Sequence, residues 1–112
     1  MSSDMDTVGF AKSVTYDGLN YKCGMILIQG SLGGLPEFGE IIQMVILQDK
    51  LIFIVKKLIG WYIEHYRAFD LKPSPVEKVD LIEPQELQDT YPLADYKIGG
   101  MRLVTLKIYI HV

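Results

Sequence analysis

The hydrophobic pattern of the chain is dominated by residues 41–71, where apolar side chains are interrupted only by short polar breaks. Ile, Val, Phe and Tyr are frequent in this run, and such a composition is typical of strands in a packed sheet. Residues 40–48 and 51–57 are predicted to pair as a hairpin across a turn at 49–50. Both alternating sets of side chains are apolar along 41–47, so this strand should be covered on both sides or face a partner.

The same reasoning predicts shorter strands on both sides of this run. They cover residues 13–16, 21–29, 61–71, 79–82 and 101–112, with turns at 17–20, 59–60 and 99–100 and a loop at 30–36. Residues 83–87 suit one helical turn, because a proline and acidic residues stand at its start. Residues 1–11 are expected to be a flexible N-terminus and residues 12–112 a single domain. The fold class expected is mostly β, a small partly closed SH3-like barrel with one short helical turn.

Composition narrows the class of protein further. The single cysteine among 112 residues excludes an intrachain disulfide, which fits a reducing, intracellular compartment. No stretch reaches the roughly 18–20 uninterrupted apolar residues of a membrane helix, and the N-terminal residues do not resemble a secretory signal. The apolar fraction of 49% is high for a small soluble domain. We therefore expect some apolar surface at an interface, in a homodimer or with the rest of a larger parent protein.

Charge is unevenly distributed along the chain. The net charge of −3 disfavours general binding to a phosphate backbone, which needs clustered lysine and arginine. Residues 77–95 contain six acidic residues and one lysine. Such an acidic rim would favour a basic partner, for example a peptide tail, and the plain alternative is a solvated loop.

No group of residues indicates catalysis, a cofactor or a metal, so we expect a non-enzyme. Cys23 lies in a predicted strand and is expected to be a small core residue. The two histidines, His65 and His111, have no neighbouring side chains at the spacing of metal ligands. The glycines of residues 30–34 are not followed by the lysine or the helix start of a phosphate-binding loop.

The best candidate for a binding site is the aromatic stretch 61–70. In a strand, Tyr62, Glu64 and Tyr66 would share one face. Two tyrosines beside a carboxylate suggest an aromatic cage, which holds a methylated ammonium by cation–π attraction. The alternative is an amphipathic strand whose tyrosine rings simply pack. The residues predicted to bind a partner are Trp61, Tyr62, Glu64 and Tyr66.

A pair of lysines, Lys56 and Lys57, interrupts the apolar hairpin. Edge strands use lysine to block unwanted pairing, and we interpret the pair in this way. A contact with nucleic acid is the alternative, with bases stacked on neighbouring aromatic rings. The residues that would make this contact are Lys56, Lys57, Arg67 and Arg102.

Several segments resemble a poorly characterised domain of animal proteins that derive from transposable elements, some of which carry zinc-finger or SAM modules. The segments are residues 35–41, 61–69, 91–93 and 107–110, and the resemblance covers residues 20–112. More loosely, residues 18–21, 38–41 and 80–93 are similar to a bromo-adjacent homology (BAH) domain, a chromatin-associated β module. This likeness implies a BAH-like barrel, a nuclear location and a role in reading peptides.

Three functional hypotheses remain open from the sequence. The first is a non-enzymatic protein-interaction module, nuclear and chromatin-associated, that binds a peptide, a protein or itself. The second is a nucleic-acid-binding module of a transposon-derived protein. The third is a structural homodimerisation domain, suggested by the two apolar faces of residues 41–47.

Overall fold

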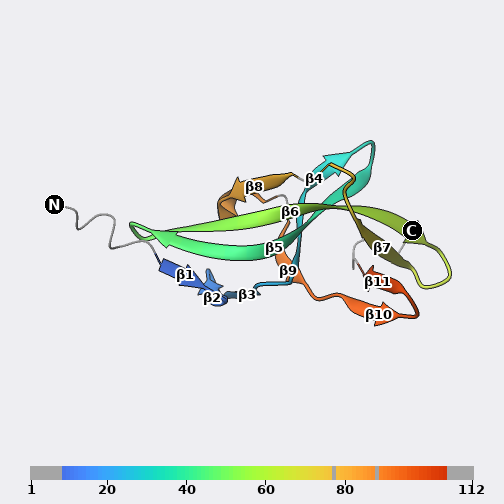
Figure 1. The fold of residues 1–112 in the computed structure, drawn as a ribbon, viewed down its shortest axis with the longest axis horizontal. Helices are drawn as coiled ribbons and strands as arrows, with labels where there is room; N and C mark the ends of the chain where they lie inside the picture. Colours follow the sequence, from blue (N-terminus) through green and yellow to red (C-terminus); the bar gives the residue numbers. More distant parts are fainter. Residues whose placement is uncertain (1–8, 77, 88, 106–112) are drawn as a thin grey trace.

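The computed structural model describes residues 9–76, 78–87 and 89–105, which form β-strands and one 3-10 turn (Figure 1). The strands are β1 (Gly9–Ala11), β2 (Ser13–Tyr16), β3 (Leu19–Lys22), β4 (Ile26–Leu32), β5 (Leu35–Leu47), β6 (Lys50–Ile63), β7 (Ala68–Pro73), β8 (Val79–Ile82), β9 (Asp89–Leu93), β10 (Tyr96–Ile98) and β11 (Met101–Val104). The 3-10 turn spans Pro84–Glu86. The predictions of a mostly β fold and of one helical turn are confirmed.

The strands form one large antiparallel sheet and one small hairpin. The large sheet has nine strands in the order β10-β11-β7-β6-β5-β4-β9, with β1 added to β5 and β8 added to β6. Strands β2 and β3 pair separately. Among the residues that the structure describes, this sheet is open and does not close into a barrel.

The long β5–β6 hairpin lies at the centre of the large sheet, and the other strands of this sheet are attached to its two sides (Figure 1). Its turn lies at Gln48 and Asp49, with φ values of 51° and 66°. Positive φ at both central residues is the requirement of a type I′ turn, whose twist matches that of the paired strands. The hairpin was therefore predicted correctly, with a turn displaced by one residue.

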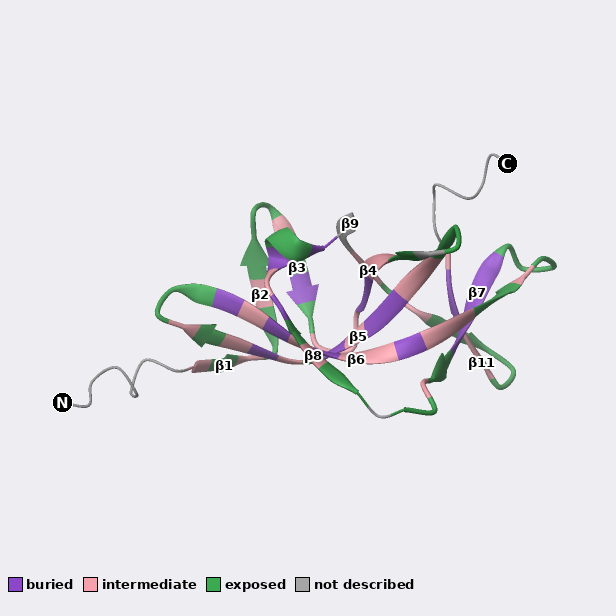
Figure 2. Ribbon diagram, turned by 90° about the horizontal axis from the view of Figure 1, so that it is seen from above, coloured by how far each residue is buried: buried purple, intermediate pink, exposed green. Residues whose placement is uncertain are grey.

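The hairpin buries opposite faces in its two halves. In β6, Val55 belongs to a first core and Leu58 to a second, and residues three apart in a strand point to opposite sides. Their cross-strand partners in β5, Ile41 and Phe38, divide between the cores in the same way. Figure 2 shows buried stretches in both parts of the hairpin. The two-sided apolar pattern thus results from one strand pair that serves two cores.

Each core draws on several strands. The first core contains Tyr21, Leu27, Ile41, Met44, Leu51, Phe53, Val55, Ile82 and Leu87. The second contains Ile26, Ile28, Phe38, Leu58, Phe69, Leu71 and Val104. A β-bulge at Ile42 keeps both Ile41 and Met44 in the first core, although the two residues are three positions apart.

The turn predicted at residues 59–60 is wrong, because β6 continues through Gly60 to Ile63. Gly60 serves instead as a place of close approach. A Cβ atom there would lie 2.5 Å from Cε2 of Phe38, whose ring occupies that space in the second core. A glycine covered by an aromatic ring of the neighbouring strand is a known device for fixing register.

The single strand predicted over residues 61–71 is also wrong. Strand β6 ends at Ile63, residues 64–67 form a turn, and β7 begins at Ala68. The amide N–H of Tyr66 donates to the carbonyl of Ile63 (3.2 Å), and that of Arg67 to the carbonyl of Glu64 (3.1 Å). Four-residue connections of this kind are common in hairpins.

Several other strand boundaries differ from the predicted ones. Residues 9–11, expected to be flexible, form β1 against β5. The strand predicted at 21–29 is broken at Cys23 and Gly24, and the loop predicted at 30–36 consists mainly of paired ends of β4 and β5. The last strand is described only as far as Val104, so most of the prediction for 101–112 lies outside the described residues. Cys23 is half-buried against the first core, in a turn rather than a strand.

Replacement of Gly60 by alanine tests the close approach. The added methyl group would force the buried Phe38 ring to move, so Gly60→Ala should lower the free energy of unfolding by about 1–3 kcal/mol. Urea denaturation followed by circular dichroism measures this change. Gly100→Ala is the matched control, since a Cβ at Gly100 meets nothing within 4 Å. Equal stability of the two variants would contradict the packing role of Gly60.

Candidate interaction site

The predicted binding residues lie at the end of the β6–β7 hairpin, in residues 61–67, which we call the tip. Trp61 is 61% exposed, Tyr62 45% and Tyr66 36%. Glu64 is exposed in the turn between the strands. The structure therefore gathers all four predicted residues at one end of a hairpin.

The tip does not have the arrangement that a continuous strand would give. Trp61 and Tyr62 are consecutive in β6 and point to opposite sides of the sheet. The Tyr62 ring packs edge-on against Phe69 of β7, with centroids 5.2 Å apart, while the Tyr66 ring packs edge-on against His65 at 4.9 Å. One cage residue thus belongs to a strand, and the other two, Glu64 and Tyr66, belong to the turn.

Lys56 and Lys57 lie in the middle of the sheet. Strand β6 pairs with β5 along one edge and with β7 and β8 along the other, so the interpretation of these lysines as edge-strand protection is wrong. The ammonium of Lys57 lies 3.5 Å from a carboxylate oxygen of Glu37. Because the two lysines are consecutive in a strand, their side chains leave opposite faces.

Arg102 holds three parts of the sheet together. Its Nη1 donates to Oε1 of Glu40 in β5 (3.0 Å), and its Nε donates to Oδ2 of Asp95, just before β10. The backbone N–H of Arg102 donates to Oδ1 of the buried Asp70 in β7 (3.1 Å). Lys72 adds a further ion pair to Asp70, at 3.4 Å.

The charge of Arg102 is compensated within the molecule. Burial opposes the charged form of the guanidinium, but hydrogen bonds and Coulombic attraction from Glu40 and Asp95 outweigh it and raise the Arg102 pKa above its usual value. This role was missed by sequence reasoning, because Glu40 is 62 positions away and no local motif links the two residues.

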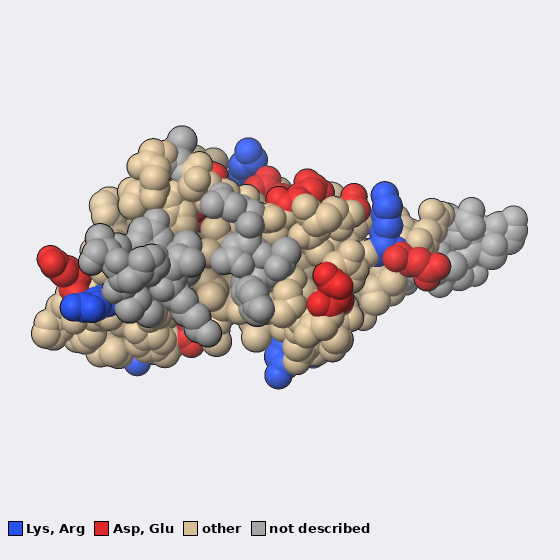
Figure 3. All heavy atoms as spheres, turned by 180° about the vertical axis from the view of Figure 1, so that it is seen from behind, with Lys and Arg blue, Asp and Glu red and all other residues tan. Residues whose placement is uncertain are grey.

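The four basic residues predicted to contact nucleic acid are not brought together. Lys56 and Lys57 leave opposite faces of β6, Arg67 lies at the tip, and Arg102 is engaged by two carboxylates. In the view of Figure 3, basic side chains occur at separate places, with acidic side chains near several of them. The described surface therefore lacks the continuous basic stripe through these residues that backbone binding would use.

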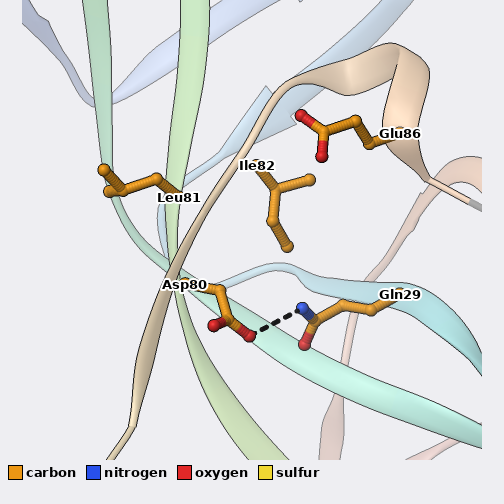
Figure 4. A pocket seen from close by; sticks show the side chains of 5 residues that line it. All are labelled: Gln29, Asp80, Leu81, Ile82 and Glu86. Atoms are coloured by element: carbon orange, nitrogen blue, oxygen red, sulfur yellow. Dashed lines mark hydrogen bonds between the residues drawn. The ribbon is translucent and has the colours of Figure 1, made fainter.

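A hollow of about 330 Å³ lies beside β8, lined by Gln29, Asp80, Leu81, Ile82 and Glu86 (Figure 4). Nε2 of Gln29 donates to Oδ2 of Asp80 (3.3 Å), which connects β4 to β8 across this hollow. Glu86 accepts the N–H of Glu83 at the start of the 3-10 turn. Asp80 and Glu86, two residues of the predicted acidic rim, therefore line a concave surface where their carboxylates can accept hydrogen bonds.

Comparison with models of known families, with curated proteins and with solved structures found no match for this chain. In the part of the chain that the structure describes, no three His, Cys, Asp or Glu side chains are grouped so that they could hold a metal ion. Nor does any helix there have the length and apolar character needed to cross a membrane.

Replacing Arg102 by methionine should destabilise the fold by about 1–3 kcal/mol, because Glu40 and Asp95 would lose their hydrogen bonds while still partly buried. Arg67→Met is the matched control: it removes an exposed guanidinium from the tip and should change stability by less than about 0.5 kcal/mol. Chemical denaturation of Arg102→Met, of Glu40→Gln and of the double variant gives the coupling energy between the two residues. Strictly additive effects of the two substitutions on stability would contradict a stabilising interaction between Arg102 and Glu40.

Proposed function

We propose that the protein is a non-enzymatic protein-interaction module whose tip binds a protein or peptide. The supporting observation is the exposure of three aromatic rings at one hairpin end, with Trp61 more than half exposed. Tryptophan and tyrosine are enriched among the residues that dominate binding energy, since they bring a large apolar area and few rotatable bonds. Trp61 and Tyr62 belong to the ladder between β6 and β7, and Tyr66 lies in the turn that closes it.

We further propose that the partner is basic. Glu64 adds a carboxylate to the aromatic tip, and the net charge of −3 favours approach of a cationic segment. In the sharpest form of this proposal, Tyr62 and Tyr66 turn toward a methylated ammonium and Glu64 supplies the opposite charge. This form requires the edge-on contacts of the two tyrosines with Phe69 and His65 to rearrange on binding.

We also propose that the protein is nuclear and chromatin-associated. The support for this is the resemblance of its sequence to BAH-like and transposon-derived domains. A partly closed, SH3-like arrangement of the sheet likewise remains part of the proposal. Nucleic-acid binding is supported more weakly, by the exposed Arg67 in the same tip as the exposed Trp61. Such binding should weaken steeply as the salt concentration rises.

A fluorescence titration tests the tip directly, because Trp61 is the only tryptophan. Methylated and unmodified histone-tail peptides should change its emission if the tip binds a basic peptide, and a cage would prefer the methylated forms. Tyr66→Ala should weaken binding about tenfold or more, the effect of losing an aromatic anchor. Single-stranded oligonucleotides at two salt concentrations test the alternative.

Tyr16→Ala provides the matched control, since Tyr16 is similarly exposed (40%) but lies in β2, outside the tip. Its affinity for the peptide should equal that of the unmodified protein. Absence of any spectral response to the peptides, or equal effects of the two tyrosine substitutions, would refute binding at the tip.

A further inference from the structure

The half of the sheet that covers the first core has a second face, which points away from that core. Residues directly opposite in antiparallel strands share a face, and the pairing places Phe10, Val45 and Ile52 in one row across β1, β5 and β6. A second row joins Gln43, Ile54 and Leu81 across β5, β6 and β8. The next row brings in Val79, opposite Lys56. We call this surface the outer face, defined by Phe10, Val45, Ile52, Ile54, Val79 and Leu81.

The outer face is apolar and open. Phe10 and Leu81 are each 68% exposed and Val79 is 52% exposed, while the other three side chains are half-buried by their neighbours. The opposite face of the same strands is packed, with Met44, Phe53 and Ile82 in the first core. Contiguous exposed apolar surface on a soluble domain marks an interaction site, because leaving it in water is costly.

Farther along β6, the same face is covered by other strands of the chain. Leu58 lies on the same side of β6 as Ile52 and Ile54, since even-numbered positions alternate regularly along this strand. Leu58 is buried in the second core, beneath residues of β4, β7 and β11. One continuous apolar face of β6 is therefore covered by the chain itself over one half, and exposed over the other half.

The dimensions and chemistry of the outer face restrict what can cover it. Four neighbouring strands about 4.8 Å apart give a width of about 19 Å, and three rows of side chains span a similar length. A helix of about 10–12 Å diameter or a single extended peptide is too narrow for this width. The first two rows contain no charged residue, and the charges of the third row, Lys56 with Glu40 opposite it, lie at the margin of the face.

We propose that the outer face is a homodimer interface, in which two copies of the chain stack sheet on sheet about a two-fold axis. A second copy supplies a surface of the same width and the same aliphatic chemistry, and sheets with apolar faces pack in this way about 10 Å apart. The footprint of about 400 Å² per copy is below that of a standard-size interface, so the dimer is weak and forms at micromolar concentration.

Sedimentation velocity of the full chain from about 5 to about 200 µM, the range in which a small interface associates, tests this proposal. The weight-average sedimentation coefficient should rise with concentration toward that of a dimer. Leu81→Lys should raise the dissociation constant at least tenfold, because it buries a charge in the interface. Val79→Lys should act in the same way and serves as a second variant if Leu81→Lys misfolds.

Leu35→Lys is the matched control, since Leu35 is 57% exposed at the start of β5, outside the outer face. It should leave the dissociation constant unchanged. A monomer at all concentrations, a dimer that both outer-face lysines leave intact, or equal disruption by Leu35→Lys would each overturn the proposal. Peptide binding at the tip should persist in Leu81→Lys, which separates failure of the dimer from failure of the proposed function.

Discussion

The ladder between β5 and β6 is the constraint on which the rest of the structure depends. Its backbone hydrogen bonds form whichever face is buried, so the same strand pair can support a core on one side and then on the other. The change of side occurs between Val55 and Leu58 in β6, and between Ile41 and Phe38 opposite them. Every other strand of the large sheet pairs with β5, with β6 or with a strand attached to them, except β10, which is connected to β6 through β11 and β7.

Local signals in the sequence account for what could be predicted. The hairpin of residues 40–57 was predicted because both of its strands are long, apolar and separated by a short polar break. The turn at residues 99–100 and the short helical turn were marked by glycine and by proline with acidic residues. These features depend on neighbouring residues only, so a single sequence contains the information.

What failed depended on contacts between distant residues. Gly60 was interpreted as a turn signal, but it is required by the Phe38 ring of another strand. The turn at residues 64–67 contains no glycine, proline or asparagine, and Arg67 adopts a positive φ of 51° that its residue type does not indicate. Once this turn interrupts the strand, the alternation that placed Tyr62, Glu64 and Tyr66 on one face no longer holds. The role of Arg102 was hidden because Glu40 lies 62 positions away in the chain, and no local motif marks the nearer Asp95 as its second partner.

One uninterrupted strand connects the outer face to the tip. From Ile52 to Trp61, β6 advances nine positions, or about 30 Å at the rise of an extended strand. If two chains stack through their outer faces as proposed, each tip lies at a set distance from the interface, and the two tips have a fixed spacing. A partner that carries two recognition segments could then engage both tips, and the second contact would benefit from the high effective concentration set by the first. If both proposals hold, avidity would raise the affinity for such a partner above that of a single tip.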